Sequence, residues 1–197
     1  MPATIKLSEV TVHDPVRVLF GVTGVELKHA QSVMRDKVRD SWPAQRRPDQ
    51  SVYVIRLVGE VAVAYPAVFS PVIYIGEGNA FDRLYNHIAN WIAPLLLSVP
   101  QLSLEIRVCE VARRNHDTLY QHIEADLLRW FSERHGALPW FNRQWEPSKE
   151  GHYEYQNGVT RELKKMIGIG SGTTYLWAIQ PTRNNDQFAP YTKGIAK

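Results

Sequence analysis

The sequence predicts an α+β fold in which a small mixed or antiparallel sheet is flanked by helices. Apolar runs typical of buried strands occupy residues 51–59 and 71–76, and residues 102–109 alternate between apolar and polar side chains. Two segments have helical periodicity, one beginning near Asn79 and one over about 117–135. From residue 51 the predicted order is therefore strand, strand, helix, strand, helix.

The length and composition fit one core with additions at both ends. The chain has 197 residues, of which 44% are hydrophobic, and this is enough for a packed interior. We expect an N-terminal extension over 1–50 with a helix from about Glu26 to Ser41, a core over 51–145, and a C-terminal extension over 146–197 packed on the core. The stretch W-P-A-Q-R-R-P-D-Q predicts a linker into the core, and the apolar spacer between the first two strands has room for more strand.

The net charge and the cysteine count restrict which partners and which metal sites the protein can have. Twenty-three basic and 20 acidic residues give a net charge of +3, so a polyanionic partner fits only if the basic residues cluster. The single cysteine, Cys109, excludes an intramolecular disulfide and a zinc site made of several thiolates. The apolar runs are too short to cross a bilayer and no leader is visible, so we expect a soluble, cytoplasmic protein.

A basic stripe marks the N-terminal helix. Lys28, Arg35 and Arg39 lie at positions i, i+7 and i+11 and share one face. The stripe fits either a solvated basic face or a surface that contacts phosphates.

The helix that begins near Asn79 carries two residues suited to phosphate chemistry. On a helical wheel Arg83 and His87 lie together on a flank, away from the apolar stripe. They fit the solvent face of an amphipathic helix, and they equally fit a site in which arginine binds a phosphodiester and histidine carries a proton.

The second long helix contains a carboxylate in an unusual position. The wheel predicts a wet face of His122, Asp126, Arg129 and Glu133, whereas Glu124 falls at the border of the apolar stripe. A carboxylate there must be paired, protonated or bound to a cation. A salt bridge with an arginine and a single-carboxylate Mg²⁺ site both satisfy this requirement. The remaining histidines show no metal-ligand spacing and are predicted to lie at the surface.

These residues, taken in order, resemble the GIY-YIG nuclease superfamily over about Val52 to Asn142. Val52-Tyr53-Val54 stands at the first strand motif, and Tyr74-Ile75-Gly76 matches the second in full. The family's arginine and histidine match Arg83 and His87, its glutamate matches Glu124, and its asparagine matches Asn142.

The first motif departs from the family pattern. Valines replace its glycine and isoleucine, and Tyr53 and Tyr74 are 21 positions apart, so an insertion separates the two strands. Tyr65 is a rival for the first tyrosine, but Tyr53 lies in the cleaner strand. The restriction-enzyme branch of the family carries similar insertions.

The resemblance implies a metal-dependent endonuclease that hydrolyses phosphodiester bonds in double-stranded DNA. Glu124 would hold Mg²⁺ or Mn²⁺, Arg83 would steady the phosphate, and a tyrosine supported by His87 would take the proton of the attacking water. Tyr74 would line the site, and Asn142 would be a structural or water-positioning partner. A palindromic target would call for a homodimer.

Within this class we expect a restriction or defence enzyme, whose N-terminal basic helix and C-terminal segment contribute to recognition. The alternatives are a homing or repair nuclease, a DNA-binding module that lacks turnover, and a small-molecule enzyme that uses the same pocket.

Overall fold

The protein has a mixed α+β fold built around a five-stranded antiparallel sheet. The structure is a computed structural model and describes residues 3–18, 25–41, 49–99, 102–112, 118–143, 153–168, 175–180 and 182–184. Its elements are β1 (Ala3–Ile5), η1 (Leu7–Glu9), β2 (Val10–Val12), β3 (Val16–Val18), α1 (Leu27–Ser41), β4 (Ser51–Val58), β5 (Val61–Ala64), β6 (Phe69–Ser70), β7 (Val72–Gly78), α2 (Ala80–His87), η2 (Ile88–Ile92), α3 (Ala93–Ser98), β8 (Ser103–Val111), α4 (Leu119–His135), β9 (Tyr153–Tyr155), α5 (Val159–Ile167) and β10 (Trp177–Ile179).

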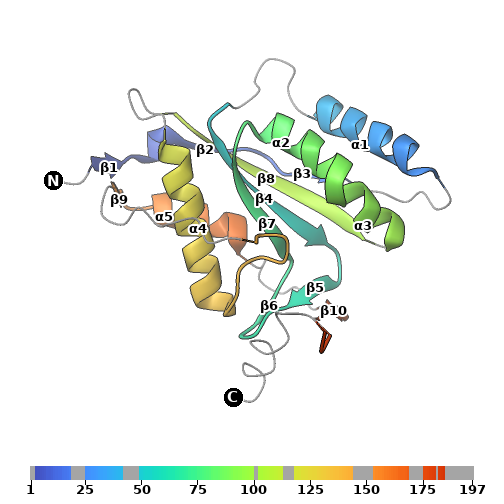
Figure 1. Cartoon of the computed structure of the whole chain (residues 1–197). Helices are drawn as coiled ribbons and strands as arrows, with labels where there is room; N and C mark the ends of the chain where they lie inside the picture. The colour runs from blue at the N-terminus through green and yellow to red at the C-terminus, as the bar shows by residue number, and fades with distance from the viewer. Residues whose placement is uncertain are drawn as a thin grey trace.

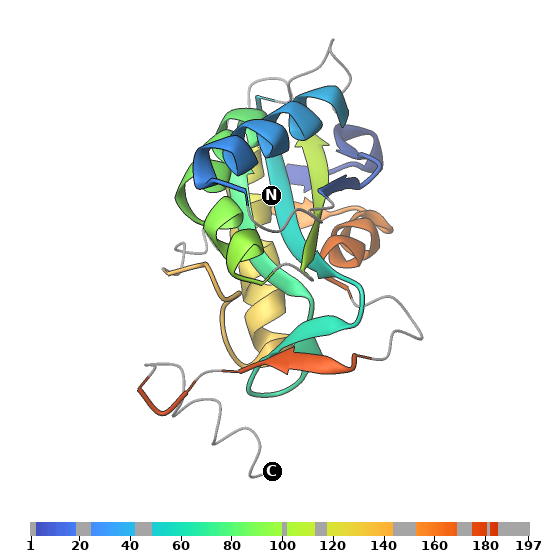
Figure 2. The ribbon, with the colours of Figure 1, turned by 90° about the vertical axis from the view of Figure 1, so that its right-hand side faces the viewer.

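The central sheet has the order β2-β8-β4-β7, with β3 also paired to β8. Helices α1 to α3 lie on one side of this sheet, and α4 and α5 lie on the other (Figures 1 and 2). Strand β4 is in the middle, and seven of its eight residues are buried, which explains its nearly continuous apolar sequence. Among the described strands, β7 pairs only with β4, so its other edge is available to residues that follow α4.

Both terminal segments contribute strands to these sheets. Strands β2 and β3 pair antiparallel with β8, so residues before position 50 extend the central sheet. Strand β1 pairs parallel with β9, and β10 pairs parallel with β5 in the segment between the first two predicted strands. Backbone hydrogen bonds thus join the two terminal segments to each other and to the core. The predicted extensions over 1–50 and 146–197 did not include these strand pairings.

Local signals place the start of α2 and the end of α4 as predicted, but the helical segment after Asn79 continues past Pro94 to Ser98. Asn79 caps α2, and its side-chain oxygen accepts a hydrogen bond from the Asp82 backbone N–H at 3.1 Å. Helix α4 ends at Gly136, whose φ of 79° is in the left-handed region that glycine adopts readily. No helix among the described residues is long and apolar enough to cross a membrane.

Two histidines predicted at the surface are buried. His122 is 8% exposed because the ring of Tyr153, on β9, packs against it at 4.7 Å between centroids. His135 is 1% exposed and stacks on Phe131 at 4.1 Å, while its Nδ1 lies 3.2 Å from the Val68 carbonyl oxygen. The prediction was wrong for both because a helical wheel recognises only one buried face, whereas α4 is also covered by segments distant in the sequence. Of the other histidines, His116 and His152 lie outside the described residues.

Candidate functional site

Two strands and one helix bring the predicted tyrosines and histidine together. In the antiparallel pairing of β4 with β7, Tyr53 lies opposite Gly76 and Ile55 lies opposite Tyr74, so both tyrosines are on the same face. Their ring centroids are 5.9 Å apart. Helix α2 covers this face, and the His87 ring lies 4.6 Å from Tyr74 and 5.9 Å from Tyr53.

Gly76 allows the two tyrosines to approach the backbone of β7. A Cβ atom at this position would lie 2.6 Å from Tyr74 Cε1 and 2.7 Å from the Tyr53 hydroxyl oxygen. No side chain fits there without displacing both rings. The glycine of the Y-I-G motif therefore has a steric reason that sequence analysis did not identify.

A chain of hydrogen bonds fixes the proton on His87. The Trp91 indole N–H, which can only donate, lies 3.0 Å from His87 Nδ1. In the neutral imidazole the proton is therefore on Nε2, which is 2.8 Å from the Tyr53 hydroxyl oxygen. His87 thus donates to Tyr53 and cannot at the same time accept a proton from it. The Trp91 ring is itself stacked on Phe141, with centroids 4.1 Å apart and planes at 17°.

Burial keeps these groups uncharged at neutral pH. Burial, and then the positive charge of Arg83, lowers the pKa of His87 to about 4. Burial, and then the neighbouring Tyr74, raises the pKa of Tyr53 far above its usual value of about 10. Burial also raises the pKa of Tyr74, although a hydrogen bond from Tyr53 and the charge of Arg83 act in the opposite direction. At rest the site therefore holds two phenols and a neutral imidazole.

Arg83 extends from the exposed face of α2 next to this cluster. Its positive charge acts to lower the pKa of all three groups. For His87 it adds to the effect of burial, and for the two tyrosines it opposes the larger effect of burial. It is the cation at the solvent side of the site.

Glu124 lies on α4, which packs on the opposite side of the sheet from α2. The residue is only 7% exposed, and the wheel correctly placed it at the border of the apolar stripe. Its negative charge acts on Tyr74 and raises the pKa of that hydroxyl. No group of three or more His, Cys, Asp or Glu side chains within the described residues is arranged to hold a metal ion. A cation at Glu124 would consequently depend on water and substrate for most of its ligands.

Asn142 has a structural position at the outer edge of β7. Its Nδ2 donates to the Ile75 carbonyl oxygen at 2.7 Å, and its Oδ1 accepts from the Ile75 backbone N–H at 3.0 Å. The side-chain amide pairs with β7 as a neighbouring strand would. Next to it, the Phe141 backbone N–H donates to the Ile73 carbonyl oxygen at 2.9 Å. Of the two roles predicted for Asn142, the geometry matches the structural one.

Tyr65 lies in a different part of the molecule. Its hydroxyl donates to the Val72 carbonyl oxygen at 2.6 Å and accepts from the Trp140 backbone N–H at 3.0 Å. Its ring packs edge-on against Phe131. Tyr53, and not Tyr65, is therefore the tyrosine that joins Tyr74 and His87.

The three basic residues predicted to contact DNA do not form an open stripe on α1. Arg39 pairs with Asp36 at 2.9 Å and with Asp40 at 3.3 Å. Arg35 lies over the Tyr85 ring, 5.5 Å from its centroid, and Lys28 is exposed. Two of the three cations thus have partners within the molecule, which weakens the prediction that this surface binds DNA.

Trp91 and Phe141 are the site residues that sequence reasoning missed. Trp91 follows His87 by four positions, a spacing that a search for i, i+4 partners could have found. The five residues Ile88–Ile92 form a single π-helical segment, a feature frequent at functional sites. Phe141 had no comparable signal, because its contact with Trp91 is purely tertiary.

Comparison with family models, curated proteins and solved structures finds no match to the chain.

Proposed function

We propose that the protein is a divalent-metal-dependent endonuclease that hydrolyses phosphodiester bonds in double-stranded DNA. The observation that carries this proposal is the convergence of Tyr53, Tyr74, His87 and Arg83 on one face of the sheet, with the charge of Glu124 acting on Tyr74. The motif positions and the order of elements from β4 to α4 also support a core of the GIY-YIG type.

Glu124 is the residue that would hold the metal ion. A single, largely buried carboxylate suits Mg²⁺ or Mn²⁺, because such ions keep several waters and take further oxygen ligands from substrate phosphate. A bound ion would neutralise the negative charge that develops on the phosphate and on the leaving oxygen. It would also offset the carboxylate charge that now raises the pKa of Tyr74.

Tyr74 is the better placed of the two tyrosines to accept the proton of the attacking water. It is half-buried, whereas Tyr53 is fully buried behind it. Trp91 donates to His87, and His87 donates to Tyr53. A hydrogen bond from Tyr53 then acts to lower the pKa of Tyr74, against the effect of burial, so the chain of donors stabilises negative charge on Tyr74. Arg83, the exposed cation beside them, binds the phosphate.

The type of nuclease rests on the resemblance described above. The insertion between the motif strands favours a restriction or defence enzyme over a homing or repair nuclease. A palindromic target for such an enzyme would be matched by a homodimer.

The test is cleavage of supercoiled DNA by the wild type and by Glu124→Gln, with Mg²⁺, with Mn²⁺ and with EDTA. We expect nicking or linearisation by the wild type only, and only with metal. Glu133→Gln, an exposed residue on the same helix, is the matched control and retains activity. A wild-type protein that cleaves no DNA with any divalent metal contradicts the proposal.

One observation favours a second function, a DNA-binding module that lacks turnover. In the resting site both tyrosines are protonated, and His87 carries its proton on the nitrogen that faces Tyr53, so no base is ready. Such a module would shift DNA in a gel, with an affinity that falls steeply as salt rises, and cleave none of it.

A further inference from the structure

A cavity with a basic lining opens on the side of the sheet opposite α2. Its volume is about 860 Å³, and it runs along α5 to the end of that helix at Gly168. Four of its lining residues are cationic and none is acidic. The four are Arg107 from β8 and Arg161, Lys164 and Lys165 from α5.

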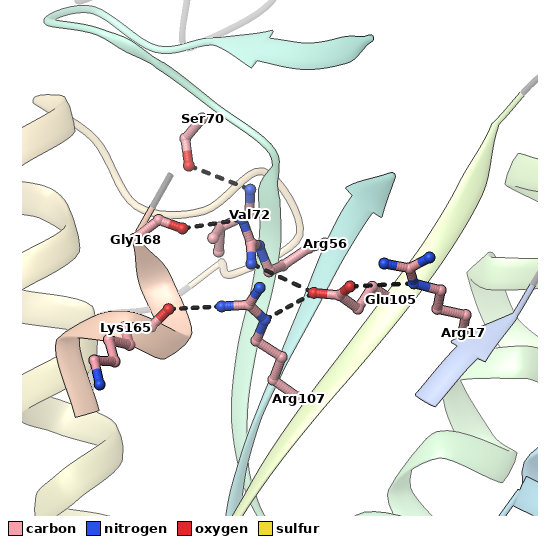
Figure 3. A network of polar contacts seen from close by, with 8 residues as sticks. All are labelled: Arg17, Arg56, Ser70, Val72, Glu105, Arg107, Lys165 and Gly168. Carbon is pink, nitrogen blue, oxygen red and sulfur yellow. Dashed lines mark hydrogen bonds and ion pairs between the residues drawn. The ribbon is translucent and has the colours of Figure 1, made fainter. Parts of the chain in front are cut away.

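The ion pairs around the cavity leave positive charge in excess. Arg17, Arg56 and Arg107 share one carboxylate, that of Glu105, at 3.6, 3.4 and 2.7 Å (Figure 3). Arg161 and Lys165 share Glu162, at 3.5 and 2.8 Å. Three arginines thus share one carboxylate at this wall, and Arg161 and Lys165 share another, so cations outnumber carboxylates in these ion pairs.

Arg107 is held in a fixed orientation at the wall of the cavity. Its Nε donates to Glu105 at 2.7 Å, and its Nη1 donates to the Lys165 carbonyl oxygen at 2.7 Å (Figure 3). A guanidinium oriented in advance loses little entropy when it binds an anion.

The neighbouring Arg56 reports the same positive field. Burial, and then the charge of Arg107, lowers its pKa to about 10 despite its contact with Glu105. Its Nε is buried and has no hydrogen-bond partner among the described residues.

We infer that this cavity binds the phosphate of a nucleotide unit. An anion offsets the excess charge, and guanidinium groups match phosphate geometry. The volume is that of a small-molecule site and exceeds the needs of a lone inorganic ion. The nucleotide unit belongs either to duplex DNA, in which case the inference deepens the proposed function and rests on it, or to a free mononucleotide.

The first arm of the test measures binding of a short labelled duplex by fluorescence anisotropy in EDTA, at several salt concentrations. The double variant Arg161→Gln with Lys165→Gln removes two exposed cations from the cavity. The control, Lys37→Gln with Arg134→Gln, makes the same change in charge at two exposed positions away from the cavity, on α1 and at the end of α4. If the cavity holds the DNA backbone, the logarithmic salt dependence falls by about two for the cavity variant, and the control stays near wild type.

The second arm titrates adenosine monophosphate and inorganic phosphate and follows the amide NMR signals of α5. Saturable shifts with the mononucleotide that disappear in the cavity variant assign the site to a free nucleotide. The inference is overturned if the cavity variant and the control bind DNA equally and neither small ligand shifts the α5 signals. Binding in EDTA needs no turnover, so loss of the proposed nuclease activity and loss of this site are separate results.

Discussion

Two clusters of similar composition adjoin β7, one at its middle and one at its first residue, and only the first has the properties of a site. Each combines a tyrosine with a histidine whose pKa burial lowers to about 4: Tyr53 with His87, and Tyr65 with His135. In the second cluster both hydrogen bonds of the tyrosine hydroxyl go to the backbone, and His135 contacts a backbone carbonyl oxygen. In the first cluster the partner of the hydroxyl is a side chain, and Tyr74 and Arg83 continue the cluster towards solvent.

The comparison shows that residue types alone do not define a site. Tyr65 is held by groups that cannot change their charge, so its hydroxyl serves packing. Tyr53 is held by His87 and lies beside an exposed arginine and a tyrosine on which a carboxylate acts, so protonation of one group affects the others.

The largest expected effect is the loss of activity in Tyr74→Phe. We expect DNA cleavage to fall by about 10²–10³-fold, because the proposed proton acceptor is removed. Tyr65→Phe is the matched variant from the other cluster, and its cleavage rate stays near wild type. Equal losses in both variants, measured with folded protein, would remove the distinction between the clusters.

Tyr65→Phe is expected instead to lower the free energy of unfolding by about 1–3 kcal/mol. The substitution leaves the buried Val72 carbonyl oxygen and the Trp140 N–H without their hydrogen-bond partner. Urea denaturation followed by circular dichroism measures the change. A variant as stable as the wild type would show that the hydroxyl is not structural.

Gly76→Ala tests the steric basis of the first cluster. The added methyl group would overlap both tyrosine rings, and we expect a loss of about 1–3 kcal/mol in stability together with reduced cleavage. Denaturation and cleavage assays on the same sample measure both effects. Unchanged stability would mean that the rings move aside at little cost.

Both clusters predict destabilisation by acid. Each histidine has a pKa of about 4 in the folded protein, below the unperturbed value of about 6.5, so the unfolded chain binds protons more readily between these values. Stability is therefore complete above about pH 6.5 and falls as the pH drops towards 4, by at most about 1.4 kcal/mol per pH unit for each histidine.

His87→Gln and His135→Gln should each remove part of this slope. The measurement is urea denaturation at a series of pH values, referred to each variant's own stability at neutral pH. A slope that neither substitution reduces would place the acid sensitivity in other groups.

The smallest expected effect is that of Trp91→Phe. Without the indole N–H, His87 Nδ1 loses the donor that fixes its tautomer, while the aromatic contact with Phe141 remains possible. We expect a loss of activity of about 10-fold and a changed ¹⁵N signature of the His87 ring by NMR. An unchanged tautomer would show that Tyr53 alone determines it.

The sequence by itself determined the α+β class, the start of the first long helical segment near Asn79, the end of the second at Gly136, and the common flank of Arg83 and His87. These depend on periodicity, caps and turns of a few residues, which local sequence encodes. It also placed Glu124 at the border of an apolar stripe, because a helical wheel needs only the residues of one helix.

Only the tertiary structure decided which tyrosine joins the site, that Asn142 pairs with β7, and that His122 and His135 are buried. It also joined β2 and β3 to β8 and collected a basic cavity from β8 and α5. Each of these depends on contacts between side chains and strands whose partners no local periodicity identifies. The resemblance supplied the candidate residues, and packing decided which of them share one environment.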